Sequence, residues 1–207
     1  MHPVKNAQVG ENRLQIWDEK EQQPDMYGGE MDSQSLFTFI LEMAGTIAFA
    51  ASGAMVGAQR GMDIFGICVL GVVTAVGGGA TRDIILGIVP PGMFQNPIYT
   101  IVATVTSCIV FAIMYWKQEL LEGENRLVYD KIMLVMDSVG LGVFTVMGVD
   151  KGITEGYMGR TFFLVFLGTV TGVGGGLIRD MMAGVPPYIF VRHIYACASI
   201  VGAIVYV

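Results

Sequence analysis

Long apolar segments alternate with short polar or turn-like connections along most of this chain. Five of the segments have 18 to 26 residues and the last has 15, against the roughly 20 that a helix needs to cross a bilayer. The segments carry almost none of the polar stripe that marks a soluble helix. The pattern predicts an all-α integral membrane protein with six transmembrane helices. The predicted spans are Leu36–Ala58, Ile64–Val89, Ile98–Trp116, Ile132–Val149, Phe162–Val185 and His193–Val207.

Residues 1–35 differ from the rest of the chain, because they are polar and acidic. Most of the net charge of −6 lies in this segment, which predicts a disordered acidic tail. Its charge argues against nucleic acid as a partner, since phosphate binding requires clustered basic residues. It also lacks the apolar core of a signal peptide.

Composition gives no support for an enzyme or a bound cofactor. Cys68, Cys108 and Cys197 lie in apolar runs without metal-ligand spacing, which is typical of buried small side chains. His2 and His193 are far apart in the sequence, so we expect no metal site. The motifs of phosphate loops and nucleophile elbows are also missing from the sequence.

The chain contains an internal repeat. The sequence VGGGATRD at 76–83 recurs as VGGGLIRD at 173–180, and a shift of 97 positions aligns them. A shift of 95 places Glu42 on Asp137. Each copy then holds three spans: one with an acid, one with the glycines and the Arg-Asp pair, and a plain one. An odd number of spans forces the two copies into opposite orientations, which is the inverted-repeat plan of 3+3 helices.

This repeat divides the chain into four segments. The expected organisation is a tail at 1–35, a first repeat at 36–116, a connecting loop at 117–131 and a second repeat at 132–207.

Three consecutive glycines weaken a helix and expose its backbone. Exposed carbonyl groups are tolerated at membrane depth only where they face protein or a water-filled cavity. We therefore expect the glycines to open the second and fifth spans and to line a path for an ion or a polar solute. The alternative is that they only allow close helix packing. The glycines are Gly77, Gly78, Gly79, Gly174, Gly175 and Gly176.

Six charged residues lie within the predicted spans. Arg82-Asp83 and Arg179-Asp180 are adjacent pairs, and neighbours in sequence do not face each other on a helix. We therefore expect crosswise ion pairs, Arg82 with Asp180 and Arg179 with Asp83. Glu42 and Asp137 are possible accessory acids for a cation path. An equally supported interpretation is that they reach water near the starts of their helices.

The segments GTIAFAASGAMVGAQRGMDIFG and TAVGGGATRDIILG, followed by the second VGGGLIRD, resemble the bacterial trimeric intracellular cation (TRIC) channels, a sequence family also labelled a glycine transporter domain. The resemblance implies two inverted three-helix repeats, a seventh helix and a homotrimer in the bacterial inner membrane, surrounded by lipid. It also implies a pore in each protomer that conducts K⁺ and Na⁺. By this analogy the six glycines are helix kinks in the pore, and the two Arg-Asp pairs are its motif charges.

Three functions stay open from the sequence. The first is a channel for monovalent cations, and the second is a secondary transporter of a small amino acid such as glycine, since inverted repeats with broken helices also occur in transporters. The third is a membrane protein without transport activity, in which the glycines serve packing alone. The seventh helix of the family is missing from the 207 residues, so we expect the chain to be truncated before it.

Overall fold

The computed structural model describes residues 33–116, 125–191 and 193–207. It divides into the units Met1–Phe37 and Thr38–Val207, and the second unit contains the helical bundle discussed below. Apart from residues 33–35, with which a helix begins, the expected acidic tail lies outside the described residues.

Every regular secondary-structure element among the described residues is a helix. Five of these helices are long and apolar enough to cross a membrane, and the last long helix has a shorter apolar segment, Ala196–Tyr206. The predicted all-α membrane fold is therefore confirmed. The long helices are α2 (Ser33–Gln59), α3 (Ile64–Leu86), α5 (Ile98–Trp116), α6 (Asn125–Gly152), α7 (Thr161–Met182) and α9 (His193–Tyr206).

Several helix ends differ from the predicted spans for local reasons. Glycines in the left-handed conformation follow α3 and α7, Gly87 with φ of 74° and Gly184 with φ of 66°, so both helices stop before their apolar segments do. In contrast, α6 begins at Asn125, inside the stretch expected to be a connecting loop. Its first turns are too polar to be recognised as a membrane span, although Tyr129 within them is buried.

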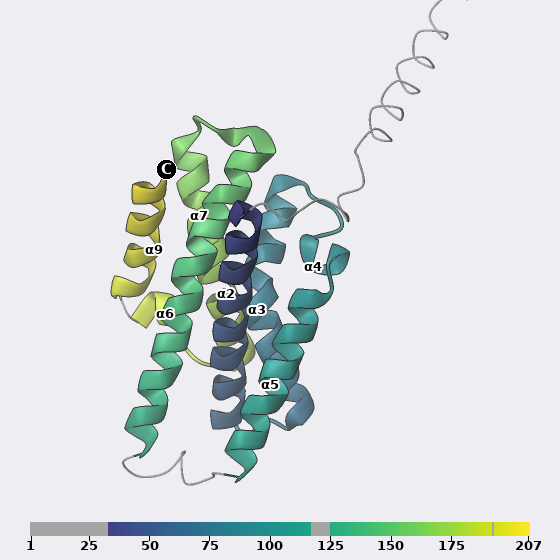
Figure 1. Ribbon diagram of the computed structural model, residues 1–207. Helices are drawn as coiled ribbons and strands as arrows, with labels where there is room; N and C mark the ends of the chain where they lie inside the picture. Colours follow the sequence, from purple (N-terminus) through teal and green to yellow (C-terminus); the bar gives the residue numbers. More distant parts are fainter. Residues whose placement is uncertain (1–32, 117–124, 192) are drawn as a thin grey trace, which may run out of the picture. The chain divides into compact units, whose positions relative to one another are not determined.

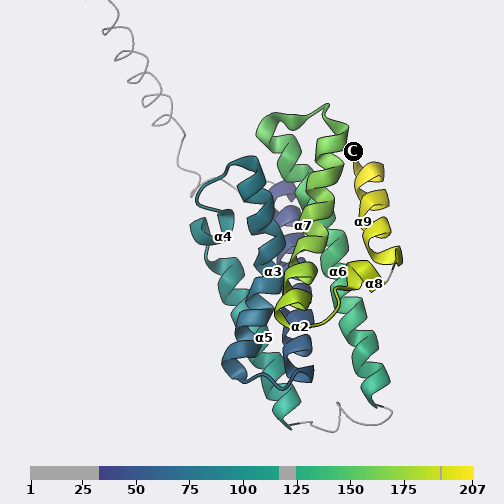
Figure 2. The same cartoon turned by 180° about the vertical axis from the view of Figure 1, so that it is seen from behind.

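Three short elements were not predicted. Helix α4 (Gly92–Gln95) follows the first Pro-Pro pair and helix α8 (Tyr188–Val191) follows the second. A π-helical turn, η2 (Ile153–Tyr157), extends α6 beyond Gly152. Figure 2 shows α4 beside the start of α5 and α8 beside the start of α9.

The two repeats run in opposite directions. In Figure 1, α2, α5 and α7 run downward, whereas α3, α6 and α9 run upward. The first repeat therefore runs down, up and down, and the second runs up, down and up. Helices α3 and α7 pack against each other, and each also contacts the last helix of its own repeat. The inverted arrangement expected from the sequence is consistent with this bundle.

Candidate functional site

The triple glycines lie where α3 and α7 touch. A Cβ atom added to Gly78 would overlap the carbonyl oxygen of Thr171, and one added to Gly175 would overlap that of Thr74. At Gly174 an added Cβ would lie 3.2 Å from the Cα of Gly78. The glycines therefore allow two backbones to approach in the way that small residues do in membrane proteins.

Both helices stay helical through the glycines. Residues 64–86 and 161–182 are each one continuous α-helix, so the expectation that the glycines open these spans is wrong. The alternative interpretation, that the glycines allow close helix packing, describes the local structure. Contact with the facing backbone compensates for the missing side chains. The carbonyl oxygen of Gly77 also accepts a hydrogen bond from the Thr81 hydroxyl at 2.8 Å.

The two motif aspartates fix the short helices. The Oδ2 atom of Asp83 accepts the backbone N–H of Gly92 at 2.7 Å, and that of Asp180 accepts the N–H of Tyr188 at 2.9 Å. Gly92 and Tyr188 are the first residues of α4 and α8. Each carboxylate therefore ties the end of a long helix to the short helix that follows its Pro-Pro turn, and both aspartates are buried.

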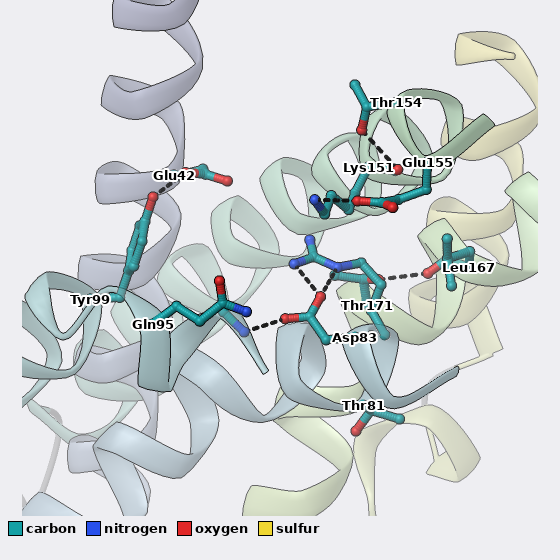
Figure 3. Close-up of polar contacts among 12 residues, drawn as sticks. Glu42, Thr81, Asp83, Gln95, Tyr99, Lys151, Thr154, Glu155, Leu167 and Thr171 are labelled. Atoms are coloured by element: carbon teal, nitrogen blue, oxygen red, sulfur yellow. Dashed lines mark hydrogen bonds and ion pairs between the residues drawn. The ribbon is translucent and has the colours of Figure 1, made fainter. Parts of the chain in front are cut away.

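The crosswise ion pairs are not formed. Arg82 Nε donates to Asp83 Oδ1 at 2.9 Å, and Arg179 Nε donates to Asp180 Oδ1 at 2.8 Å. The prediction failed because an arginine side chain is long enough to fold back onto the next residue. Figure 3 shows the Asp83 carboxylate, with dashed lines to the groups that it binds.

Arg179 belongs to a buried polar network that joins three long helices. Its Nη1 atom forms an ion pair with Asp137 on α6 and donates to Ser52 Oγ on α2 at 2.6 Å. The Ser52 hydroxyl donates to Asp137 Oδ1 at 3.1 Å. The Arg179 side chain is 1% exposed, and its guanidinium carbon lies 5.9 Å from the centre of the Tyr188 ring. The sequence singled out Asp137 and Arg179, but nothing in it pointed to Ser52 as their partner.

An apolar cluster fills the same end of the bundle. Leu70, Met55 and Met133 are buried there with Tyr129, and Tyr188 packs against them. The Tyr129 hydroxyl donates to the backbone oxygen of Met55 at 2.6 Å. Side chains therefore close the bundle near α8.

A cavity of about 350 Å³ with both apolar and charged side chains in its lining lies near α4. It reaches the glycine segment of α3 at Gly79. Three carboxylates and two basic side chains are among the groups that line it. These charged residues are Glu42, Asp83, Asp150, Arg82 and Lys151.

Each basic residue at the cavity has a nearby carboxylate. The ion pair of Arg82 with Asp83 has an N–O distance of 2.8 Å, and that of Lys151 with Glu155 has one of 2.6 Å. Glu42 instead accepts a hydrogen bond from the Tyr99 hydroxyl (Figure 3). The lining has a formal excess of negative charge, which makes the cavity more favourable for a cation than for an anion.

Comparison with protein families and curated proteins identifies the family. The family model described as "Glycine transporter" matches residues 39–115 and 134–207. The chain belongs to this family. The UPF0126 inner membrane protein YadS of Escherichia coli K12 is 40% identical over 172 residues, covering 83% of this chain and 78% of that protein. A UPF0126 membrane protein of Deinococcus radiodurans is 38% identical over 165 residues, covering 79% of this chain and 72% of that protein.

Solved structures link this family to TRIC channels. The TRIC trimeric intracellular cation channel orthologue from Rhodobacter sphaeroides is 31% identical, with a TM-score of 0.71 and coverage of 81% of each chain. A prokaryotic TRIC channel in 0.5 M KCl is 30% identical, with a TM-score of 0.73 and coverage of 83% of each chain. The resemblance found in the sequence is confirmed, and the protein is a multi-pass membrane protein of the bacterial inner-membrane type.

Proposed function

We propose that this protein is a membrane channel for monovalent cations, with K⁺ and Na⁺ passing through each protomer. The solved structures that it resembles over four-fifths of its length are described as cation channels. The observation that carries the proposal is the cavity near α4, because its lining has an excess of carboxylates and extends from the exposed residues Gln95 and Asn96 to the glycine segment of α3 at Gly79. Carboxylates at membrane depth attract cations and disfavour anions.

The proposed path begins in the cavity and continues beside the glycine segments of α3 and α7. Gly79 leaves the cavity wall without a bulky side chain, because a Cβ added there would have only Arg82 within 4 Å. Glu42 and Asp150 supply the attraction for cations, since the charges of Arg82 and Lys151 are balanced by Asp83 and Glu155. Beyond the contact, the Arg179 network and the Met55 cluster close the path.

We also propose that the functional unit is a homotrimer. The Rhodobacter sphaeroides relative is described as a trimeric channel. The long helix α5 supports this, because apolar side chains on its outer side are exposed in the single chain, among them Ile101, Val105 and Ile109. Lipid or a neighbouring copy covers such a surface in a membrane.

A transporter of a small amino acid is the second candidate. The family is described as a glycine transporter, and a cavity with charged groups of both signs suits a zwitterion, whose carboxylate and ammonium groups need opposite partners. This candidate predicts uptake that saturates with the solute, whereas a channel passes ions without such a solute.

Flux into liposomes separates the two candidates. The purified protein is reconstituted, and potassium flux and uptake of labelled glycine are measured on the same preparation. Potassium flux that is reduced by Glu42→Gln supports the channel. Saturable glycine uptake without potassium flux contradicts it and supports the transporter.

A further inference from the structure

The cavity near α4 has an apolar wall that a potassium path does not require. Two aromatic rings line it, Tyr99 at the start of α5 and Phe144 on α6, together with the thioethers of Met93 and Met147. Selective sites for K⁺ are built from rings of oxygen atoms. Aromatic and thioether groups supply no such oxygen atoms, so this wall suits a ligand that has an apolar surface of its own.

A carboxylate lies directly beside one of these rings. The Tyr99 hydroxyl donates a hydrogen bond to Glu42, as Figure 3 shows. Glu42 and Asp150 both line the cavity and form no ion pair within the part of the chain that the structure describes. The two basic residues of the lining are each paired with an acid. The negative charge that remains for a ligand therefore lies next to the aromatic wall.

The size of the cavity also fits a small molecule. Its volume of about 350 Å³ falls in the range of roughly 300–1,000 Å³ that is typical of small-molecule pockets, which combine apolar walls with a few polar groups. An alkyl-substituted ammonium ion matches both parts of such a lining. Its charge is attracted by a carboxylate and by the face of an aromatic ring, and its alkyl groups pack against apolar side chains.

We propose that this cavity binds small organic ammonium cations, with the charged group at Glu42 and Tyr99 and the alkyl groups against Phe144 and Met93. A cation bound there competes with K⁺ for the same cavity. The competition rests on the proposed channel function, whereas the binding itself does not. The inference names a class of ligand that the potassium path alone does not predict.

Three compounds of similar shape test the class of ligand. Choline is a cation, 3,3-dimethyl-1-butanol is its neutral analogue, and glycine betaine is a zwitterion with the same trimethylammonium group. Each is titrated at constant ionic strength into the purified full chain in detergent, and thermal unfolding is measured. A compound that binds the folded protein raises the unfolding temperature in a concentration-dependent way, which gives its dissociation constant. We expect choline to bind at least about tenfold more tightly than the other two, the effect of one charged contact.

Substitutions then locate the bound cation. Glu42→Gln should weaken choline binding by about tenfold or more. Asp130→Asn is the matched control, because it removes the same charge from an exposed residue about 30 Å along α6 from Asp150. Tyr99→Leu removes the ring and should weaken binding by about fivefold. Tyr99→Phe keeps the ring and should lose less affinity than Tyr99→Leu.

Several results would overturn the inference. Equal binding of the neutral analogue indicates an apolar pocket without charge recognition, and equal binding of glycine betaine indicates a site for zwitterions. Equal losses in Glu42→Gln and Asp130→Asn place the cation elsewhere. The comparison of the three compounds uses the unsubstituted protein, so it decides the question even where a variant does not fold.

Potassium flux from liposomes, measured with and without choline, separates this inference from the proposed function. Choline should slow the flux, and more K⁺ should relieve the inhibition. Potassium flux in a protein that does not bind choline refutes the ammonium site alone. Choline binding in a protein without potassium flux refutes the channel alone, and binding that leaves the flux unchanged refutes the competition.

Discussion

Phe49 and Phe144 occupy equivalent positions in the two repeats and stack on each other, with their ring centres 5.2 Å apart. Gly45 and Gly140 are also equivalent in the two repeats, and each faces the ring of the other repeat. A Cβ added to Gly45 would touch Phe144, and one added to Gly140 would overlap Phe49. The stacked rings therefore mark the centre of the inverted repeat, where α2 and α6 meet.

Phe49→Ala tests whether this contact holds the two repeats together. Phe49 is 1% exposed, and truncation of a buried phenylalanine typically costs about 3 kcal/mol or more because a cavity is left. We expect a lower thermal unfolding temperature in detergent. Phe162→Ala is the control, since Phe162 is 88% exposed in the single chain. Equal effects of the two variants would contradict a central role for the stacked pair.

Gly78→Ala tests the close contact of α3 with α7. The added methyl group would overlap a backbone oxygen that cannot rotate away, so the helices must separate, at a cost of roughly 1–3 kcal/mol for overpacking. Gly142→Ala is a matched control on α6, because an added Cβ there has nothing within 4 Å. Thermal unfolding checks both variants, and a Gly78→Ala protein as stable as the unsubstituted one would refute the packing role.

We expect Asp180→Ala to lower the thermal unfolding temperature more than Asp83→Ala does. Loss of Asp180 removes one of the carboxylates that compensate the fully buried Arg179, and breaking such a pair costs about 3–5 kcal/mol. Water in the cavity can solvate Arg82 after the loss of Asp83, so Asp83→Ala should lower the unfolding temperature less. Comparison of the two unfolding temperatures tests the difference in burial, and the reverse order would contradict it.

Cys68 on α3 and Cys108 on α5 test the pairing of these helices. Their sulfur atoms lie 3.5 Å apart. Copper phenanthroline with dissolved oxygen should therefore oxidise the two thiols to a disulfide, detected as a linked peptide pair by mass spectrometry. Cys68→Ser should abolish the linked pair. A thiol pair that stays reduced while other accessible thiols react would contradict the contact.

Hydropathy and the internal repeat predicted most of the fold from the sequence. The length of each apolar segment defines a membrane span, and the doubled VGGG motif with three spans in each copy defines the inversion. Hydropathy failed at the start of α6, because Asn125 and the polar residues after it continue a helix without lengthening its apolar segment.

The site was harder to predict, because its contacts join distant segments. The internal repeat identified the glycines and the Arg-Asp pairs but gave no information on whether the glycines open a helix or receive a neighbouring backbone. The partner of Gly78 is the carbonyl group of Thr171, which any residue provides. Ser52 in the Arg179 network likewise has no distinguishing sequence signal. Arg82 and Arg179 differ in burial because different side chains surround them, and two nearly identical motifs contain no information about this difference.

Electrical recording from the purified protein in a planar bilayer, under a KCl gradient, tests the central claim most directly. The account predicts discrete current steps whose reversal potential lies near that of potassium, and a smaller conductance for Glu42→Gln with the protein still folded. A bilayer that stays silent with folded protein, or a reversal potential near that of chloride, would contradict a cation channel.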